Sequence, residues 1–99
     1  MFKSALAYNG EELNNPSIVI VDLREDHLFQ KEHIPSAINI PFSEIDTRYK
    51  ELDRTKQIVF VCHTGSMGDE STKLLIKNGF KKVENLKGGM AQWTGPLTS

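Results

Sequence analysis

Runs of β-branched and other apolar residues, separated by polar segments long enough for a helix, constrain the fold of this chain more than any other feature. Ile18–Val21 is continuously β-branched, and Gln57–Val61 is apolar after its first residue. Such runs are typical of strands that are buried on both faces of a parallel sheet. Two further strands are predicted at Ala37–Ile40, where Pro41 closes the run, and at 82–86.

The segments between these strands favour helices, because their apolar side chains recur at helical spacing. Helices are predicted over Arg24–Lys31, Ser43–Leu52, 68–78 and Met90–Trp93. Ser43 is the expected N-cap of the second of them. Glu11–Leu13 also favours a short helix near the start of the sequence.

The helix predicted over 68–78 has a recognisable end signal. Gly79 stands where a left-handed residue follows a helix, and Phe80 can then fold back on Leu75, as in a Schellman motif. Strands that alternate with helices along the chain predict an α/β domain with a mostly parallel central sheet of about four to five strands. Helices are expected on both faces of that sheet.

Size and charge limit the function classes. The chain of 99 residues suits one domain, expected to span residues 1–99, because two independent cores need more residues. Twelve basic and thirteen acidic residues argue against a nucleic-acid or membrane partner. No segment approaches the roughly 20 apolar residues of a membrane span, and no signal peptide is apparent, so a cytoplasmic protein is expected.

The single cysteine, Cys62, comes directly after the predicted strand Gln57–Val61. One cysteine excludes an internal disulfide and a multi-cysteine metal site within the chain. A short loop with two glycines follows, made of His63, Thr64, Gly65, Ser66, Met67 and Gly68. Such a loop can direct backbone N–H groups inward, and a helix N-terminus behind it favours a thiolate and any anion bonded to it.

The residues alone leave two interpretations of Cys62 open. A cysteine after an apolar strand is often a small buried side chain that serves packing alone. A cysteine at the carboxyl end of a parallel strand also stands where α/β proteins bind ligands, and a glycine loop there can stabilise a nucleophilic thiolate.

Motifs on both sides of the loop add a resemblance. They are Val21–Arg24 (VDLR), Phe29, His33–Pro41 (HIPSAINIP), Gly79-Phe80 and Leu86–Trp93 (LKGGMAQW). With the Cys-x-x-Gly loop, in this order and spacing, they resemble the single-domain rhodaneses over about residues 10–93. The resemblance implies a rhodanese-like α/β fold, and Gly88-Gly89 is expected to form a tight turn against the loop.

The resemblance also implies a sulfurtransferase. In that family a cysteine thiolate takes the sulfane sulfur of a donor such as thiosulfate, becomes a persulfide, and passes the sulfur to a thiol or to cyanide. Cys62 would be the nucleophile, and the amides from His63 to Gly68 would hold the terminal sulfur. No metal or organic cofactor is implied. The partners are a small sulfur donor and an outside thiol or protein acceptor, because the chain has no second cysteine.

The loop departs from the family pattern in its charge. Met67 stands where the family often has an arginine, and His63 stands at another position that is frequently arginine. Asp69 and Glu70 follow at once and would repel a thiolate or thiosulfate. A protein or low-molecular-weight persulfide is therefore an alternative donor to thiosulfate.

Other thiolate functions suit the same fold class. A cysteine phosphatase needs an arginine six residues after the cysteine, where this chain has Gly68, and no arginine occurs after Arg54. An arsenate-reductase-like thiol enzyme and a non-catalytic or redox-sensing rhodanese-like binding module stay as alternatives. The presence of both Cys62 and the glycine loop favours catalysis over binding alone.

Polar residues outside the loop are expected to support it. Asp22 and Arg24 are expected to pair with each other or to bond nearby loops at the carboxyl edge of the sheet. His33 is expected to fix a turn by hydrogen bonding. His63, when protonated, would stabilise a neighbouring thiolate. The three histidines lack metal-ligand spacing with Cys62, so no metal site is expected.

Overall fold

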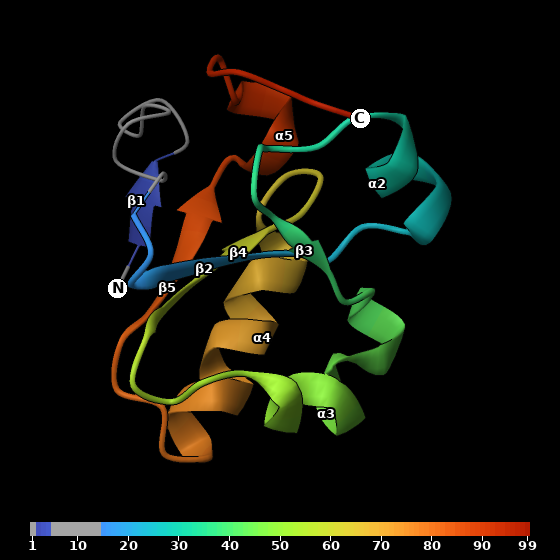
Figure 1. Ribbon diagram of the computed structural model, residues 1–99. Helices are drawn as coiled ribbons and strands as arrows, with labels where there is room; N and C mark the ends of the chain where they lie inside the picture. Colours follow the sequence, from blue (N-terminus) through green and yellow to red (C-terminus); the bar gives the residue numbers. More distant parts are fainter. Residues whose placement is uncertain (1, 5–14) are drawn as a thin grey trace.

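The computed structural model describes residues 2–4 and 15–99 of the chain. Within them five strands form one sheet in the order β1-β5-β4-β2-β3, and all neighbours pair in parallel (Figure 1). The strands are β1 (Phe2–Ser4), β2 (Ile18–Asp22), β3 (Ile38–Asn39), β4 (Gln57–Val61) and β5 (Val83–Lys87). The predicted α/β class is confirmed. β1 had not been predicted, and the helix expected at Glu11–Leu13 lies outside the described residues.

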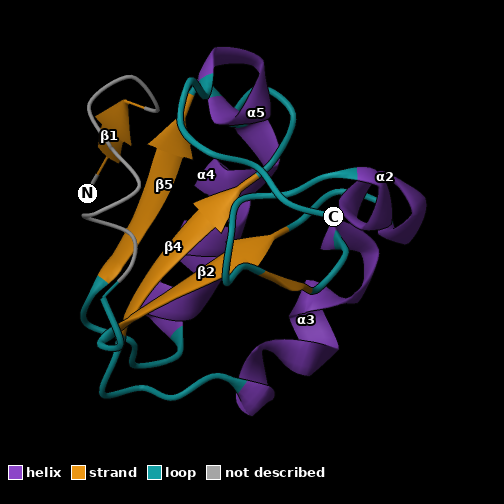
Figure 2. Ribbon diagram, turned by 45° about the horizontal axis from the view of Figure 1, so that its top comes forward, coloured by secondary structure: helices purple, strands orange, loops and turns teal. Residues whose placement is uncertain are grey.

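Helical elements pack against both faces of the sheet (Figure 2). They are α2 (Asp26–Lys31), the 3-10 turns η2 (Phe42–Glu44) and η3 (Tyr49–Glu51), α3 (Ile45–Arg48), α4 (Ser66–Lys77) and α5 (Gly89–Gln92). α3 and α4 contribute to one buried cluster, whereas α2 and α5 pack on the other. None of the helices in the described part of the chain is long and apolar enough to cross a membrane.

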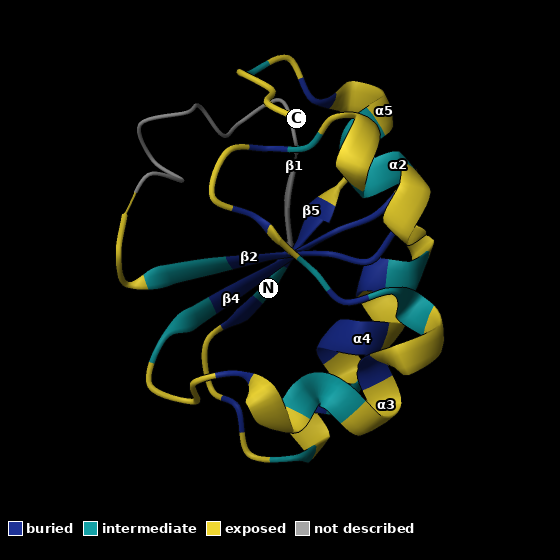
Figure 3. Cartoon of the chain, turned by 45° about the vertical axis from the view of Figure 1, so that its right-hand side comes forward, coloured by how far each residue is buried: buried dark blue, intermediate teal, exposed yellow. Residues whose placement is uncertain are grey.

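The central strand β4 is buried on both faces, which explains why its sequence shows no alternation of polar and apolar residues. Ile58 and Phe60 belong to the cluster on the α4 face, and Val59 and Val61 belong to the cluster on the opposite face. Figure 3 shows β2 and β4 teal where they begin and dark blue further along, whereas the helices carry exposed residues in yellow. Because both faces are covered, every position after the first must be apolar, and the strand predicted at Gln57–Val61 is confirmed residue for residue.

Several elements begin or end elsewhere than predicted. β2, β5 and α5 differ by a single residue at one or both ends, and the differences at α2, β3 and α4 are larger. α2 begins two residues later, at Asp26, because the Arg24 side chain turns inward to pair with Asp22. β3 covers half of the predicted strand, because Ala37 still closes a turn and donates its N–H to the Ile34 carbonyl at 3.1 Å. α4 begins two residues earlier than predicted, at Ser66.

The helix predicted over Ser43–Leu52 is wrong in form. The segment comprises three short pieces, η2, α3 and η3, in place of one helix. Ser43 is not an N-cap, because the first turn already starts at Pro41, whose carbonyl accepts the Glu44 N–H at 2.8 Å. The expected apolar contacts of the segment do form, since Ile45 and Leu52 are buried.

The end of α4 confirms the predicted Schellman motif. Gly79 has a φ of +91°, the Phe80 N–H donates to the Leu75 carbonyl at 3.0 Å, and the Gly79 N–H donates to the Ile76 carbonyl at 3.2 Å. Phe80 and Leu75 lie in the same buried cluster. The C-terminus of α4 is therefore fixed by its own residues. Its N-terminus lies at the carboxyl edge of the sheet, close to Cys62.

Candidate active site

Cys62 follows β4 directly, at the edge of the sheet where α4 begins. The residue is 1% exposed, and the Gly65 N–H donates a hydrogen bond to its Sγ at 3.0 Å. This geometry needs a glycine, because the Gly65 φ of +113° is a left-handed conformation that side chains disfavour. The Cys-x-x-Gly turn therefore presents a backbone donor to the sulfur.

The N-terminus of α4 adds further donors on this side of the sheet. Gly65 is the N-cap residue, and no side chain caps the helix. The Asp69 N–H donates to the Gly65 carbonyl at 3.1 Å, so the amides of Ser66, Met67 and Gly68 are those of the first turn, which an α-helix leaves without an intrahelical acceptor. With the positive end of the helix dipole, such amides stabilise a thiolate or an anion bonded to it.

The helix α5 supports the loop through its backbone amides. The Met90 N–H donates to the Cys62 carbonyl at 2.8 Å, and the Ala91 N–H donates to the His63 carbonyl at 3.0 Å. A Cβ on Gly89 would lie 2.2 Å from the Cys62 carbonyl oxygen. The close approach expected of Gly88-Gly89 is therefore confirmed, and it fixes the backbone of the loop at the position of the sulfur.

Asn85 on β5 supports the loop from the side, and the sequence analysis missed it. The residue is 1% exposed, and its Nδ2 donates to the Gly65 carbonyl at 2.7 Å and to Asp69 Oδ1 at 2.9 Å. A Cβ on Gly68 would lie 1.8 Å from Asn85 Oδ1, so the second loop glycine makes room for this amide. The sequence carries no clear signal for it, because β5 also contains a glutamate and a lysine and a further polar residue there does not stand out.

Asp22 and Arg24 form the expected ion pair. Arg24 donates from Nε and Nη2 to the Asp22 carboxylate at 2.8–3.1 Å, and its Nη2 also donates to the Glu32 carbonyl at 2.8 Å. Both side chains are buried, with 1% and 8% exposed. The guanidinium is therefore engaged inside the fold. It organises the loop after β2 and is not directed at Cys62.

His33 fixes a turn, as expected. Its Nδ1 lies 2.7 Å from the Phe29 carbonyl oxygen, and because a carbonyl accepts only, this nitrogen carries the proton. The ring stacks on Phe29 with centroids 3.8 Å apart, and the backbone of His33 exchanges two hydrogen bonds with Thr98 at 2.8 Å. The contacts of His33 are therefore structural, since they join the end of α2 to the segment around Thr98.

His63 contacts a carboxylate. Its Nε2 lies 3.2 Å from Glu25 Oε2, and both side chains are about half exposed. The backbone N–H of Glu25 and, after it, the His63 ring lower the pKa of Glu25 from its ordinary value of 4.5. Within the described part of the chain, the polar contact of the His63 ring is thus with Glu25 and not with Cys62 Sγ.

The remaining loop side chains differ in exposure. Thr64 and Ser66 are exposed, and Met67 is half-buried against the cluster that contains Cys62. Beside Met67 lies a cavity of about 180 Å³, which is lined by Leu23, Glu25, Pro41, Phe42, Ser43 and Met67. Across residues 2–4 and 15–99, no three His, Cys, Asp or Glu residues are grouped so that they could hold a metal ion.

A parallel α/β domain whose buried cysteine meets a glycine turn and a helix N-terminus defines a class of thiol proteins. Within that class, residues 6–96 match the rhodanese-like domain family, and the chain belongs to this family. The resemblance noted in the sequence motifs is thereby confirmed.

Relatives and solved structures agree with this assignment. The chain is 38% identical to the putative sulfur carrier protein YrkF of Bacillus subtilis over 90% of this chain and 48% of that protein, so it spans about half of YrkF. It is 36% identical to the putative sulfurtransferase YtwF of the same organism, over 79% of this chain and 75% of that protein. A rhodanese-related protein of Thermoplasma volcanium superposes with a TM-score of 0.80 at 26% identity, covering 92% of this chain and 95% of the other.

Proposed function

We propose that this chain is a sulfurtransferase that carries one sulfane sulfur as a persulfide on Cys62. The observation that supports this most is the backbone hydrogen bond from Gly65 to Sγ, placed at the N-terminus of α4. The relatives named as a sulfur carrier and as a sulfurtransferase support the same chemistry.

The loading step balances without a cofactor. The Cys62 thiolate attacks the outer sulfur of the donor, the S–S bond of the donor breaks, and the leaving group departs with the electron pair. From thiosulfate the leaving group is sulfite, and from a persulfide it is a thiolate. The Cys62 persulfide that results is anionic, and we propose that the amides of Gly65 to Gly68 hold its terminal sulfur; the Gly65 N–H on Sγ and the uncapped N-terminus of α4 support this.

A persulfide donor suits this site better than thiosulfate. Met67 brings no charge, the Arg24 guanidinium is engaged by Asp22, and Glu25 faces His63. The thiosulfate dianion would therefore meet backbone amides but no free arginine side chain among the residues described around the loop, and the Glu25 carboxylate would repel it.

We expect Met67→Arg to lower the KM for thiosulfate by about tenfold, since charge-assisted hydrogen bonds are roughly twice as strong as neutral ones. An unchanged KM would remove the argument from loop charge.

The second half of the cycle needs an acceptor from outside this chain. Cys62 is the single cysteine of the sequence, so no internal thiol can resolve the persulfide. An external thiolate attacks the terminal sulfur, the S–S bond to Cys62 breaks, and the Cys62 thiolate leaves with the electron pair. The proposed acceptors are a small thiol, a protein thiol or cyanide.

Intact mass spectrometry tests the proposal. After incubation with thiosulfate or with glutathione persulfide, we expect the native protein to gain about 32 Da, one sulfur atom, and Cys62→Ser to gain nothing. Cys62→Ser changes one atom of a buried side chain, and its circular dichroism spectrum controls for folding. No gain with either donor would contradict sulfur transfer and favour a rhodanese-like binding module.

A further inference from the structure

A groove runs along α4 away from the Cys62 loop. Three adjoining cavities of about 180, 160 and 290 Å³ make it up, and each has Phe42 in its wall. Met67 lines the first two, and Glu70 lines the second and third. The three cavities are therefore neighbours, and together they extend from the Cys62 loop toward the middle of α4.

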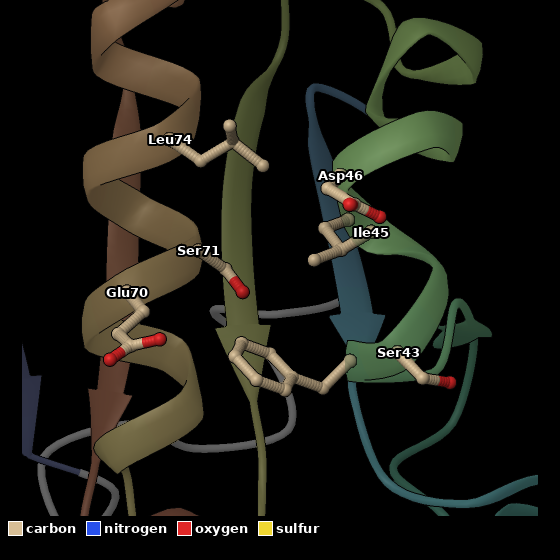
Figure 4. A pocket seen from close by; sticks show the side chains of 7 residues that line it. Ser43, Ile45, Asp46, Glu70, Ser71 and Leu74 are labelled. Carbon is tan, nitrogen blue, oxygen red and sulfur yellow. The ribbon is translucent and has the colours of Figure 1, made fainter.

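The walls of the groove come from two segments that are distant in the sequence. Met67, Glu70, Ser71 and Leu74 share one face of α4, since they are spaced at i, i+3, i+4 and i+7. The segment 42–46, from η2 into α3, forms the opposite wall (Figure 4). From Met67 to Leu74 the helix rises about 10 Å, which is the length of about three residues of extended chain.

The charge along this groove has one sign. Its linings include the carboxylates of Glu25, Asp46 and Glu70, and among the described residues that line it there is no lysine or arginine. Two arginines adjoin the lining along the chain, and both are engaged: Arg24 by Asp22, and Arg48 by Glu44 and Glu51. The groove therefore favours a cationic occupant over an anionic one.

Ser71 supplies an independent sign of a ligand. The residue is 1% exposed, and its Oγ has no hydrogen-bond partner in the described part of the chain. Figure 4 shows its side chain directed from α4 toward the segment that carries Ser43 and Ile45. A buried hydroxyl without a partner is unfavourable, and a backbone N–H or C=O of a bound segment would satisfy it.

We propose that this groove binds a basic, extended segment of an acceptor protein and brings its thiol to Cys62. The inference rests on the proposed function, since it names the class of acceptor for the persulfide. About three residues of the segment would lie between α4 and the 42–46 wall, with lysine or arginine side chains near Asp46 and Glu70. Its cysteine would lie at the Met67 end, next to the Cys62 loop.

Binding can be measured without any sulfur transfer. The probe is an acetylated hexapeptide with serine first, in place of the acceptor cysteine, and lysine at its third and fifth positions. A matched peptide has glutamate in place of both lysines. By titration followed with NMR, we expect the lysine peptide to bind about tenfold more tightly, to shift the amides of Met67, Glu70 and Ser71, and to weaken as salt is raised.

Variants of the protein locate the binding. Glu70→Gln and Asp46→Asn are each expected to weaken the lysine peptide by about threefold, because each removes one exposed ionic contact. The matched control is Asp53→Asn, which makes the same charge change in the turn before β4. Asparagine can keep the hydrogen bonds that Asp53 accepts from Thr55. We expect the control to bind like the native protein.

Three outcomes of these measurements would overturn the proposed groove. Equal binding of the two peptides, absence of binding, or equal weakening by Asp53→Asn would overturn the proposal. Because the peptides contain no thiol, a failure of Cys62 to load sulfur would contradict the proposed function and leave the measured binding intact. Loading without preference for the lysine peptide would contradict the groove alone.

Discussion

The loops after β2 and β4 leave neighbouring parallel strands at the same edge of the sheet, yet they are held in opposite ways. Asp22 and Val61 pair in register, and the Leu23 N–H donates to the Val61 carbonyl at 2.7 Å. Beyond this point the β2 loop is fixed by the buried Asp22–Arg24 ion pair. The β4 loop is fixed by backbone hydrogen bonds and by glycines that allow close approach.

This difference distinguishes a rigid frame from the loop that we propose as the reactive one. The charged groups of the β2 loop satisfy each other, so this loop acts as a frame. In the β4 loop no side chain caps α4, so the first amides of that helix have neither an intrahelical acceptor nor a side-chain cap. Each loop is also held by one asparagine from the neighbouring strand. Asn39 Nδ2 donates to the Asp22 and Arg24 carbonyls, and Asn85 Nδ2 donates to the Gly65 carbonyl and to Asp69 Oδ1.

The largest expected effect lies in the β2 loop. Asp22→Ala leaves the buried Arg24 guanidinium without its carboxylate, and removing one partner of a buried pair destabilises a fold by about 3–5 kcal/mol. Urea denaturation measures this loss. The double variant Asp22→Ala with Arg24→Met is expected to be more stable than the single variant. If the two are equally unstable, the unpaired charge is not the cause.

The close approach of Gly89 to the β4 loop gives the next effect. Gly89→Ala places a methyl group against the Cys62 carbonyl, which cannot move without moving the sulfur, so we expect a loss of about 3 kcal/mol. The control is Gly79→Ala, which also has positive φ but meets only the end of the flexible Arg54 side chain, and about 1 kcal/mol is expected. Equal losses in urea denaturation would mean that φ alone, and not the contact with Cys62, sets the effect.

The two asparagines allow the loops to be compared directly. Asn85→Leu and Asn39→Leu each remove an amide that donates two hydrogen bonds, and each is expected to destabilise the fold by about 2 kcal/mol. Only Asn85→Leu is expected to slow sulfur loading, because Asn85 positions the Gly65 turn. Stopped-flow loading rates measure this. Equal slowing by both variants would show that loading reports stability and not the geometry of the turn.

The smallest effect concerns the exposed Glu25–His63 contact. The pKa of Glu25 is lowered mainly by its own backbone N–H and next by His63, so His63→Ala should raise it only part of the way to 4.5. A lowered carboxylate pKa stabilises the fold at higher pH, and this contribution is lost as pH falls through the folded pKa, below 4.5. NMR titration of the Glu25 carboxyl carbon measures the shift. A full return to 4.5 would make His63 the main cause.

The sequence predicted the sheet and the position of Cys62 well, because both depend on local patterns. The run Gln57–Val61 is apolar since both faces of β4 are buried, and the Gly79 signal depends on adjacent residues alone. Ser43 was assigned wrongly as an N-cap, because the turn that begins at Pro41 was not visible in the pattern. Patterns of adjacent residues therefore predicted strand β4 and the end of α4, but not the start of the segment after Pro41.

The supports of the site depend on residues that are distant in the sequence. Asn85 reaches Gly65 and Asp69 across the sheet, and no spacing rule connects them. The groove likewise needs Phe42 and α4 to face each other. From the sequence, Asp69 is only a charge near the sulfur, and the hydrogen bond that its Oδ1 accepts from Asn85 could not be predicted. Such contacts follow from the strand order, which the residues alone did not determine.

The most direct test of the central claim follows one sulfur through the whole cycle. The protein is loaded with glutathione persulfide, freed of excess donor, and mixed with one equivalent of a thiol, while intact masses of protein and acceptor are recorded. We predict that the protein loses about 32 Da as the acceptor gains the same mass, one for one, because Cys62 has no internal thiol to receive the sulfur. A loaded protein that keeps its added sulfur in the presence of the thiol would contradict sulfur transfer by Cys62.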